Sequence, residues 1–152
     1  MAEQDRPDNV VELRARALRL LARREHTRQE LENKLSPHAG NTEDLQNLIS
    51  GLKQKNQLSE ERFAEERARS LSRKYGAARI RQDLRAKGVA EELVARFSSS
   101  EDELQRARTI LERKYRTPAD TREEKAKRMR FLQSRGFSSE IIFKLLSARG
   151  DR

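Results

Sequence analysis

Two stretches of the sequence follow the same pattern at a fixed spacing. They read LRAKGVAEELV from Leu84 and LQSRGFSSEII from Leu132, so matching residues are 48 positions apart. In each stretch Gly follows Leu after four residues, Glu follows Gly after four more, and two branched apolar residues come next. Gly is the preferred residue just after a helix, so each stretch predicts a helix, a turn and a second helix. A recurrence at this spacing is typical of proteins built from stacked repeats.

Apolar residues recur at helical spacing along nearly the whole chain. The three Pro residues fall in stretches that read as loops, and good helix formers dominate elsewhere. We therefore predict nine helices, at about residues 10–24, 27–35, 42–55, 59–75, 78–87, 90–97, 100–115, 121–136 and 139–148.

Capping signals support the ends of these helices. Three pairs predict capping boxes, in which a Ser or Thr side chain and a Glu three residues later bond each other's backbone N–H: Thr27 with Glu30, Ser100 with Glu103, and Thr121 with Glu124. Ser59 is a further expected N-cap. Asn56 suits a left-handed position after the third helix, because Asn tolerates a positive φ.

Grouped in threes, these helices predict an all-α fold: an elongated array of three tandem three-helix repeats, each a long helix followed by two shorter ones. The expected divisions are a flexible N-terminus at 1–9 and repeats at 10–57, 58–98 and 99–150. A repeat array with closed ends is most simply a monomer. The core is expected to include Phe63, Phe97, Phe131, Phe137 and Phe143.

Composition narrows the class of protein further. The hydrophobic share is 34%, the charged share is 39% and Trp is absent. Such a chain suits amphipathic helices better than one deep core, and the regular apolar spacing argues against disorder. The absence of Cys excludes disulfides and thiolate metal sites. Without a signal peptide or a membrane-spanning run, a cytoplasmic protein is expected.

Catalysis finds little support in the residues. The two histidines, His26 and His38, lie twelve apart with no spacing suited to a shared metal, and His26 is interpreted as a polar surface residue. The six Gly residues are scattered singly, so no phosphate-binding loop is present. We therefore expect no enzymatic activity, no metal and no cofactor.

The positive charge is concentrated in two segments. The chain carries a net +9, with nine Lys and Arg against three acidic residues at 62–87 and eleven against four at 106–135. The candidate contact residues in these segments are Arg69, Arg73, Lys74, Arg79, Arg81, Arg85, Arg113, Lys114, Lys127, Arg128 and Arg130. They are interpreted as binding phosphates or acidic residues of a partner. The alternative is that they are solvated, with the arginines of the first segment paired with Glu65, Glu66 and Asp83 and those of the second segment paired similarly.

Two tyrosines close the long helices of the second and third repeats. Tyr75 ends RSLSRKY and Tyr115 ends RTILERKY. Each completes an apolar stripe or, alternatively, stacks on a nucleic-acid base.

Three segments carry a resemblance to a known family. LARREHTRQELENKL at 21–35, LSEERFAEERARSLSRKYGAARIRQDLRAKGV at 58–89 and RFLQSRGFSSEIIFKLL at 130–146 together resemble RecX, the bacterial modulator of the RecA recombinase. The resemblance covers residues 12–147 and implies a cytoplasmic protein of tandem three-helix repeats.

The resemblance also implies a function. It points to a non-enzymatic protein that binds the RecA filament on single-stranded DNA and alters ATP hydrolysis, strand exchange and cleavage of the SOS repressor. The alternative is a helical repeat protein that binds DNA or RNA directly, with only weak direct binding expected of a filament modulator.

Overall fold

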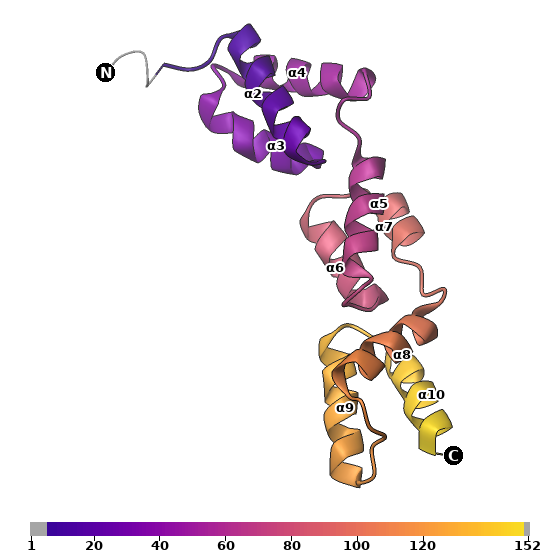
Figure 1. Ribbon diagram of the computed structural model, residues 1–152. Helices are drawn as coiled ribbons and strands as arrows, with labels where there is room; N and C mark the ends of the chain where they lie inside the picture. The colour runs from indigo at the N-terminus through magenta and orange to yellow at the C-terminus, as the bar shows by residue number, and fades with distance from the viewer. Residues whose placement is uncertain (1–5, 151–152) are drawn as a thin grey trace. The chain divides into compact units, whose positions relative to one another are not determined.

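The computed structural model describes residues 6–150, in which helices joined by short loops and turns make up most of the chain (Figure 1). Its nine α-helices and one 3₁₀ turn in that range are α2 (Val10–Arg23), α3 (Arg28–Leu35), η1 (Ser36–His38), α4 (Thr42–Gln54), α5 (Glu60–Leu71), α6 (Ala77–Ala86), α7 (Glu91–Phe97), α8 (Glu103–Lys114), α9 (Arg122–Ser134) and α10 (Ser139–Gly150). The all-α prediction is confirmed. None of these described helices is long and apolar enough to cross a bilayer.

The predicted helices agree with the structure to within a few residues. The clearest difference is α5, which ends at Leu71 and not at Tyr75. The expected order of one long and two shorter helices holds for α5, α6 and α7, of 12, 10 and 7 residues. It fails for α8, α9 and α10, which have 12, 13 and 12 residues.

Most caps form where the sequence places them. Thr27 and Glu30 make a reciprocal capping box, and the Ser59 hydroxyl accepts from Arg62 N at 3.2 Å. Thr121 accepts from Glu124 N, while the Glu124 carboxylate accepts from Asp120 N. Asn56 has φ 65°, as predicted.

The chain separates into two compact units. The first comprises residues up to Ala64 together with Lys87–Val89, and the second comprises Glu65–Ala86 and residues from Ala90 onward. These two units are defined by spatial contacts, so they do not test where one sequence repeat ends and the next begins. The predicted repeat boundaries at 57/58 and 98/99 stay a prediction. Residues 1–5 of the expected flexible N-terminus lie outside the described residues, whereas Asp8 N donates to His38 O at 2.8 Å.

The core of the first unit forms where α2, α3 and α4 pack together (Figure 1). Its buried side chains are Leu13, Ala17, Leu31, Leu35, Leu45, Leu48, Ile49, Leu52 and Leu58. All nine are aliphatic, so a chain with few apolar residues still fills a small core by placing one stripe per helix against the others.

His26 lies in this unit and is buried, which corrects the expectation of a surface residue. Only 1% of it is exposed. Its Nδ1 lies 3.0 Å from Arg24 O and its Nε2 lies 2.9 Å from Lys34 Nζ. The Lys34 ammonium can only donate, so Nε2 accepts and Nδ1 carries the proton. Burial lowers the pKa of His26 below 6.5, and the nearby Arg24 and Lys34 charges act in the same direction.

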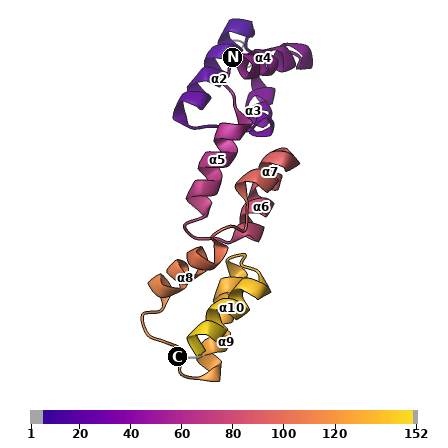
Figure 2. The same cartoon turned by 90° about the vertical axis from the view of Figure 1, so that its right-hand side faces the viewer.

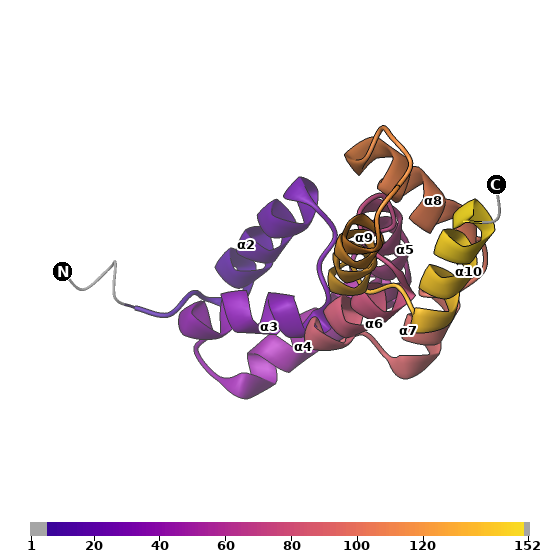
Figure 3. The ribbon, with the colours of Figure 1, turned by 90° about the horizontal axis from the view of Figure 1, so that it is seen from below.

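The second unit contains a bundle of α8, α9 and α10, which we call the third bundle; in it α10 packs on both α8 and α9 (Figures 2 and 3). Its core residues are Ala107, Ile110, Leu111, Leu132, Phe137, Ile142 and Leu145. Phe63 and Phe137 are buried as predicted, and Phe97 and Phe131 are half-buried. The prediction for Phe143 is wrong: it is 70% exposed, because Ile142 and Leu145 face the bundle and the helical period turns Phe143 away from the side that they share.

The two glycines of the repeated stretches make matching contacts. Gly88 and Gly136 have φ values of +85° and +89°. A Cβ on Gly88 would lie 2.5 Å from Oε1 and 3.0 Å from Cβ of Gln29, in the first turn of α3. A Cβ on Gly136 would lie 2.6 Å from Cβ and 2.8 Å from N of Arg79, in the first turn of α6. Each glycine therefore packs its turn against the first turn of the middle helix of the preceding repeat.

The variant Gly136→Ala should lower the urea midpoint of unfolding, since Ala meets backbone at Arg79 and adopts this φ only with strain. We expect a loss of about 1–3 kcal/mol. Gly51→Ala is the control, because Gly51 lies inside α4 with no atom near its Cβ position. It should be neutral or stabilising by up to about 1 kcal/mol. Equal midpoints for the two variants would contradict the proposed packing.

Acidification should destabilise the chain through His26. Below pH 6.5 the unfolded chain takes up a proton on this residue, whereas the folded chain, with its lowered pKa, does so only at lower pH. The free energy of unfolding therefore falls as pH drops below 6.5, down to the folded pKa. Urea unfolding at pH 7.5, 6.5 and 5.5 should show a smaller pH dependence for His26→Gln. His38→Gln removes the other histidine and should behave as wild type.

Candidate functional site

A turn between α5 and α6, residues 75–77, is held by backbone and side-chain bonds on three sides. Gly76 N donates to Arg135 O at 2.7 Å, Arg106 donates to Tyr75 O at 2.9 Å, and Ala77 N donates to the Glu103 carboxylate at 3.1 Å. We call this segment the 75–77 turn. Gly76 is required there, because a Cβ would lie 2.5 Å from Gly136 O. The turn fixes the start of α6 and the position of the Tyr75 ring.

Glu103 supplies the bond that starts α6. Its side chain is buried, with 3% exposed, and its carboxylate faces the positive end of the α6 dipole. The predicted capping box with Ser100 is therefore wrong: α8 begins after Asp102 in the left-handed region, without a side-chain cap bond. Arg106 lies beside Glu103. Burial lowers the pKa of Arg106, and the nearby Glu103 and Asp102 charges offset this lowering only in part.

An open depression of about 500 Å³ lies next to this turn in the second unit. Its lining residues come from the end of α5, the end of α8 and the end of α9: Arg73, Lys74, Tyr75, Ile110, Arg113, Lys114, Phe131 and Arg135. Five of these eight residues are cationic and none is acidic. We call this site the basic depression. Its charge makes it a candidate site for an anion.

Cations lie against the two aromatic rings, Tyr75 and Phe131, that line the basic depression. The guanidinium carbons of Arg79 and Arg135 lie 4.9 and 5.5 Å from the centre of the Tyr75 ring. Arg135 also lies 5.0 Å from the centre of the Phe131 ring, and Lys114 Nζ lies 5.8 Å from it. These distances are within the range of cation–π attraction. The rings thus hold the cations in place without neutralising their charge.

Tyr115 contacts Phe131, one of the two rings that line the basic depression. Its ring meets Phe131 edge-on at 5.9 Å, and the Arg128 guanidinium carbon lies 4.6 Å from its centre. Tyr115 also packs against the core of the third bundle, as the apolar alternative predicted. Tyr75 is half-buried and lines the basic depression, so it is the tyrosine available to a ligand.

The structure brings together only part of the predicted contact residues. Arg73, Lys74, Arg113 and Lys114 line the basic depression, and Arg79 stacks beside it. Their positions are compatible with the partner-binding interpretation, which stays a prediction.

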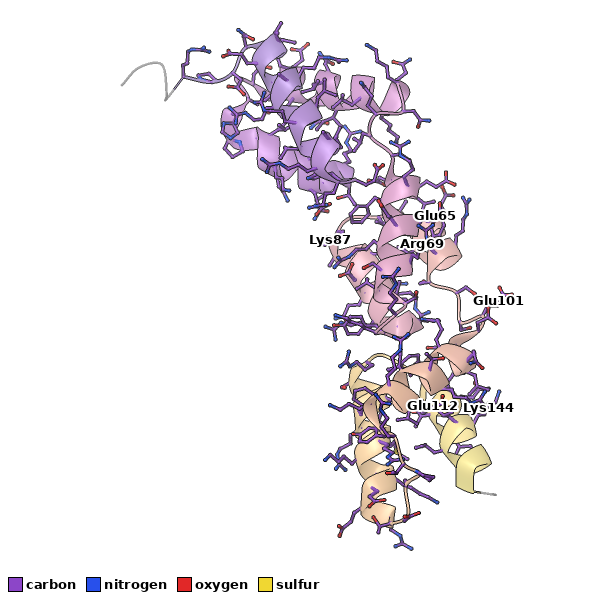
Figure 4. All side chains as sticks on the ribbon, in the orientation of Figure 1. Glu65, Arg69, Lys87, Glu101, Glu112 and Lys144 are labelled. Carbon is purple, nitrogen blue, oxygen red and sulfur yellow. The ribbon has the colours of Figure 1, made fainter. Side chains whose placement is uncertain are left out.

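Other predicted residues are engaged within the fold. Arg69 pairs with Glu65 at 3.2 Å on α5 (Figure 4). Arg85 pairs with Glu91 at 2.7 Å, and Arg81 donates to Ser98 O at 3.4 Å. The Arg69–Glu65 pair is one that the alternative named, whereas Arg85 pairs with a carboxylate of α7 that the alternative did not include.

The cations of α9 also differ from one another. Arg128 is only 6% exposed and stacks on Tyr115, so it supports the fold and is not a surface contact. Lys127 and Arg130 are exposed and lie outside the basic depression. Arg135 lines it but was missing from the candidates. Its position just before Gly136, equivalent to Lys87 before Gly88, is the sequence signal that identifies it.

The bond from Glu103 to the 75–77 turn can be tested by mutation. Glu103→Ala leaves the Ala77 N–H buried without an acceptor and should cost about 2 kcal/mol of stability. Glu103→Gln keeps an acceptor oxygen and should lose less. Urea unfolding and amide exchange at Ala77 measure the two effects, and wild-type exchange at Ala77 in Glu103→Ala would contradict this role.

Comparison with known proteins identifies the family. Models of the first, second and third RecX three-helix domains match residues 14–38, 59–96 and 101–146. The regulatory protein RecX of Herbaspirillum seropedicae is 40% identical over 138 residues, 90% of each chain. That of Chromobacterium violaceum is 39% identical over 140 residues, 91% of each chain.

The fold has a counterpart among solved structures. The crystal structure of RecX from Lactobacillus salivarius superposes with a TM-score of 0.81 at 19% identity, covering 94% of this chain and 97% of that one. It confirms the fold, while the sequence matches establish the relationship. The chain belongs to the RecX family of regulatory proteins.

Proposed function

We propose that this chain regulates the RecA recombinase by binding the RecA filament on single-stranded DNA. Binding would alter ATP hydrolysis, strand exchange and cleavage of the SOS repressor, without catalysis by the chain itself and in the cytoplasm. Membership of a family of regulatory proteins supports this proposal. The observation that carries it is the basic depression, with five cations and no lining carboxylate.

The charge of the basic depression suits the filament for a physical reason. Arg73 and Arg113 make no ion pair with any described residue; Arg73 follows α5 and Arg113 lies in the last turn of α8. Cations gathered in one place without counter-charges repel each other, and a polyanion or an acidic surface relieves that repulsion. A nucleoprotein filament presents anions of both kinds.

Direct binding of nucleic acid is the second candidate function. The specific observation in its favour is the half-buried Tyr75 ring among cations, which is the composition of a site for single strands. A direct binder should hold single strands tightly without RecA, with affinity that falls steeply as salt rises. A filament regulator should bind the RecA-coated strand much more tightly than the bare one.

The test measures ATP hydrolysis by RecA of the same organism on single-stranded DNA, with substoichiometric wild-type or variant chain. Wild type should change the rate. The double variant Arg73→Gln/Arg113→Gln should need about tenfold more protein for the same effect, because it loses two contacts to anions.

Arg19→Gln/Lys53→Gln is the matched control. It removes the same charge from exposed positions on α2 and α4, in the first unit, and should act like wild type. An unchanged ATPase rate and filament lifetime with wild type would refute the proposed function. Equal loss in both double variants would show that net charge, and not this site, is what matters.

A further inference from the structure

We propose that the basic depression is a single-nucleotide site: its cations take the phosphate of one nucleotide in a single strand, and the Tyr75–Arg wall takes its base. The inference rests on the proposed function, since it names the part of the filament that the site contacts. It goes further by assigning separate roles to the cations and to the rings.

The phosphate role follows from how the cations are placed. Arg73 and Lys74 follow α5, Arg113 and Lys114 end α8, and Arg135 follows α9. Three separate elements thus direct positive groups to one depression of about 500 Å³. Phosphate contacts of this kind supply most of the affinity for nucleic acid and make it dependent on salt.

The base role follows from the rings. Tyr75 is held by the bonds of the 75–77 turn, and the guanidinium carbons of Arg79 and Arg135 lie 4.9 and 5.5 Å from the centre of its ring. A flat cation on an aromatic ring presents a rigid planar surface, on which unpaired bases stack. An acidic protein segment could use the cations, but it has no group that requires this planar wall.

The proposed site requires a single strand of nucleic acid, whose other nucleotides lie outside the basic depression. Bases of a duplex are already stacked on each other and cannot reach a ring at the wall of a depression. The volume is in the range of small-ligand sites, about 300–1,000 Å³. Because the depression is open, it can hold one nucleotide while its neighbours in the strand continue past it.

The experiment uses the full chain without RecA and measures fluorescence anisotropy with four labelled probes. These are (dT)₁₅, (U)₁₅, a 15-mer of abasic deoxyribose phosphates, and a 15-residue polyglutamate peptide. Wild type should bind (dT)₁₅ or (U)₁₅ at least about tenfold more tightly than the abasic strand, because stacking adds to the phosphate contacts. The comparison of (dT)₁₅ with (U)₁₅ shows whether DNA or RNA is preferred.

Two variants separate the roles. Tyr75→Leu should lose about tenfold in affinity for (dT)₁₅ and much less for the abasic strand, because Phe131 still holds Arg135. Tyr75→Phe should bind as wild type. Arg73→Gln/Arg113→Gln should weaken both strands and lower the salt slope. Retained abasic binding by Tyr75→Leu also shows that the variant is folded. Arg19→Gln/Lys53→Gln is again the control and should retain binding.

Several results would overturn the inference. Equal affinity of wild type for (dT)₁₅ and the abasic strand would show charge attraction alone. Tighter binding of polyglutamate would identify an acidic protein segment as the ligand. A chain that alters RecA ATP hydrolysis but shows either result would leave the proposed function intact and remove only the nucleotide site.

Discussion

The second unit depends on the hydrogen bonds that close the 75–77 turn. Glu103 and Arg106 of α8, together with the Arg135 carbonyl after α9, bond consecutive residues of this turn. The turn is buried at Gly76 and Ala77, where an unpaired N–H would cost free energy comparable to a lost hydrogen bond. After Leu71 the chain continues as a turn, with Tyr75 N still donating to Leu71 O at 2.9 Å, and it reaches these partners at residues 75–77. They also place Tyr75 beside Phe131, so the basic depression exists only in the assembled unit.

The two glycines of the repeated stretches are a second place where the fold depends on close tertiary contacts. Gly88 and Gly136 end equivalent helices at positive φ, and each lies against the first turn of an earlier helix. Local helix-ending chemistry explains the φ values, whereas the close contacts with Gln29 and Arg79 explain why no side chain fits. The repeat is therefore a repeat of contacts as well as of sequence.

Helix positions could be predicted from the sequence because they depend on local spacing, caps and breakers. Features that depend on tertiary contacts could not. Glu103 lies three residues after Ser100, which is the spacing of a capping box, yet it serves another helix. His26 follows a run of charged residues but is buried against Lys34. Phe143 lies in an apolar helix but on its exposed side.

The candidate site was predictable to a similar extent. Charge density pointed to the two segments that contain the lining of the basic depression, because cations crowd the ends of α5, α8 and α9. It could not separate Arg73, which faces the depression, from Arg69, which pairs with Glu65 one turn away. Nor could it show that Arg128 is buried on Tyr115. Those distinctions depend on which face of each helix packs inward.

Hydrogen–deuterium exchange of the chain, free and bound to the RecA filament on single-stranded DNA, tests the central claim most directly. The basic depression predicts protection on binding at residues 72–79, 110–116 and 128–137, with little change at α2 and α4. Protection confined to α2–α4, with unchanged exchange around the 75–77 turn, would contradict the claim that this turn builds the contact site.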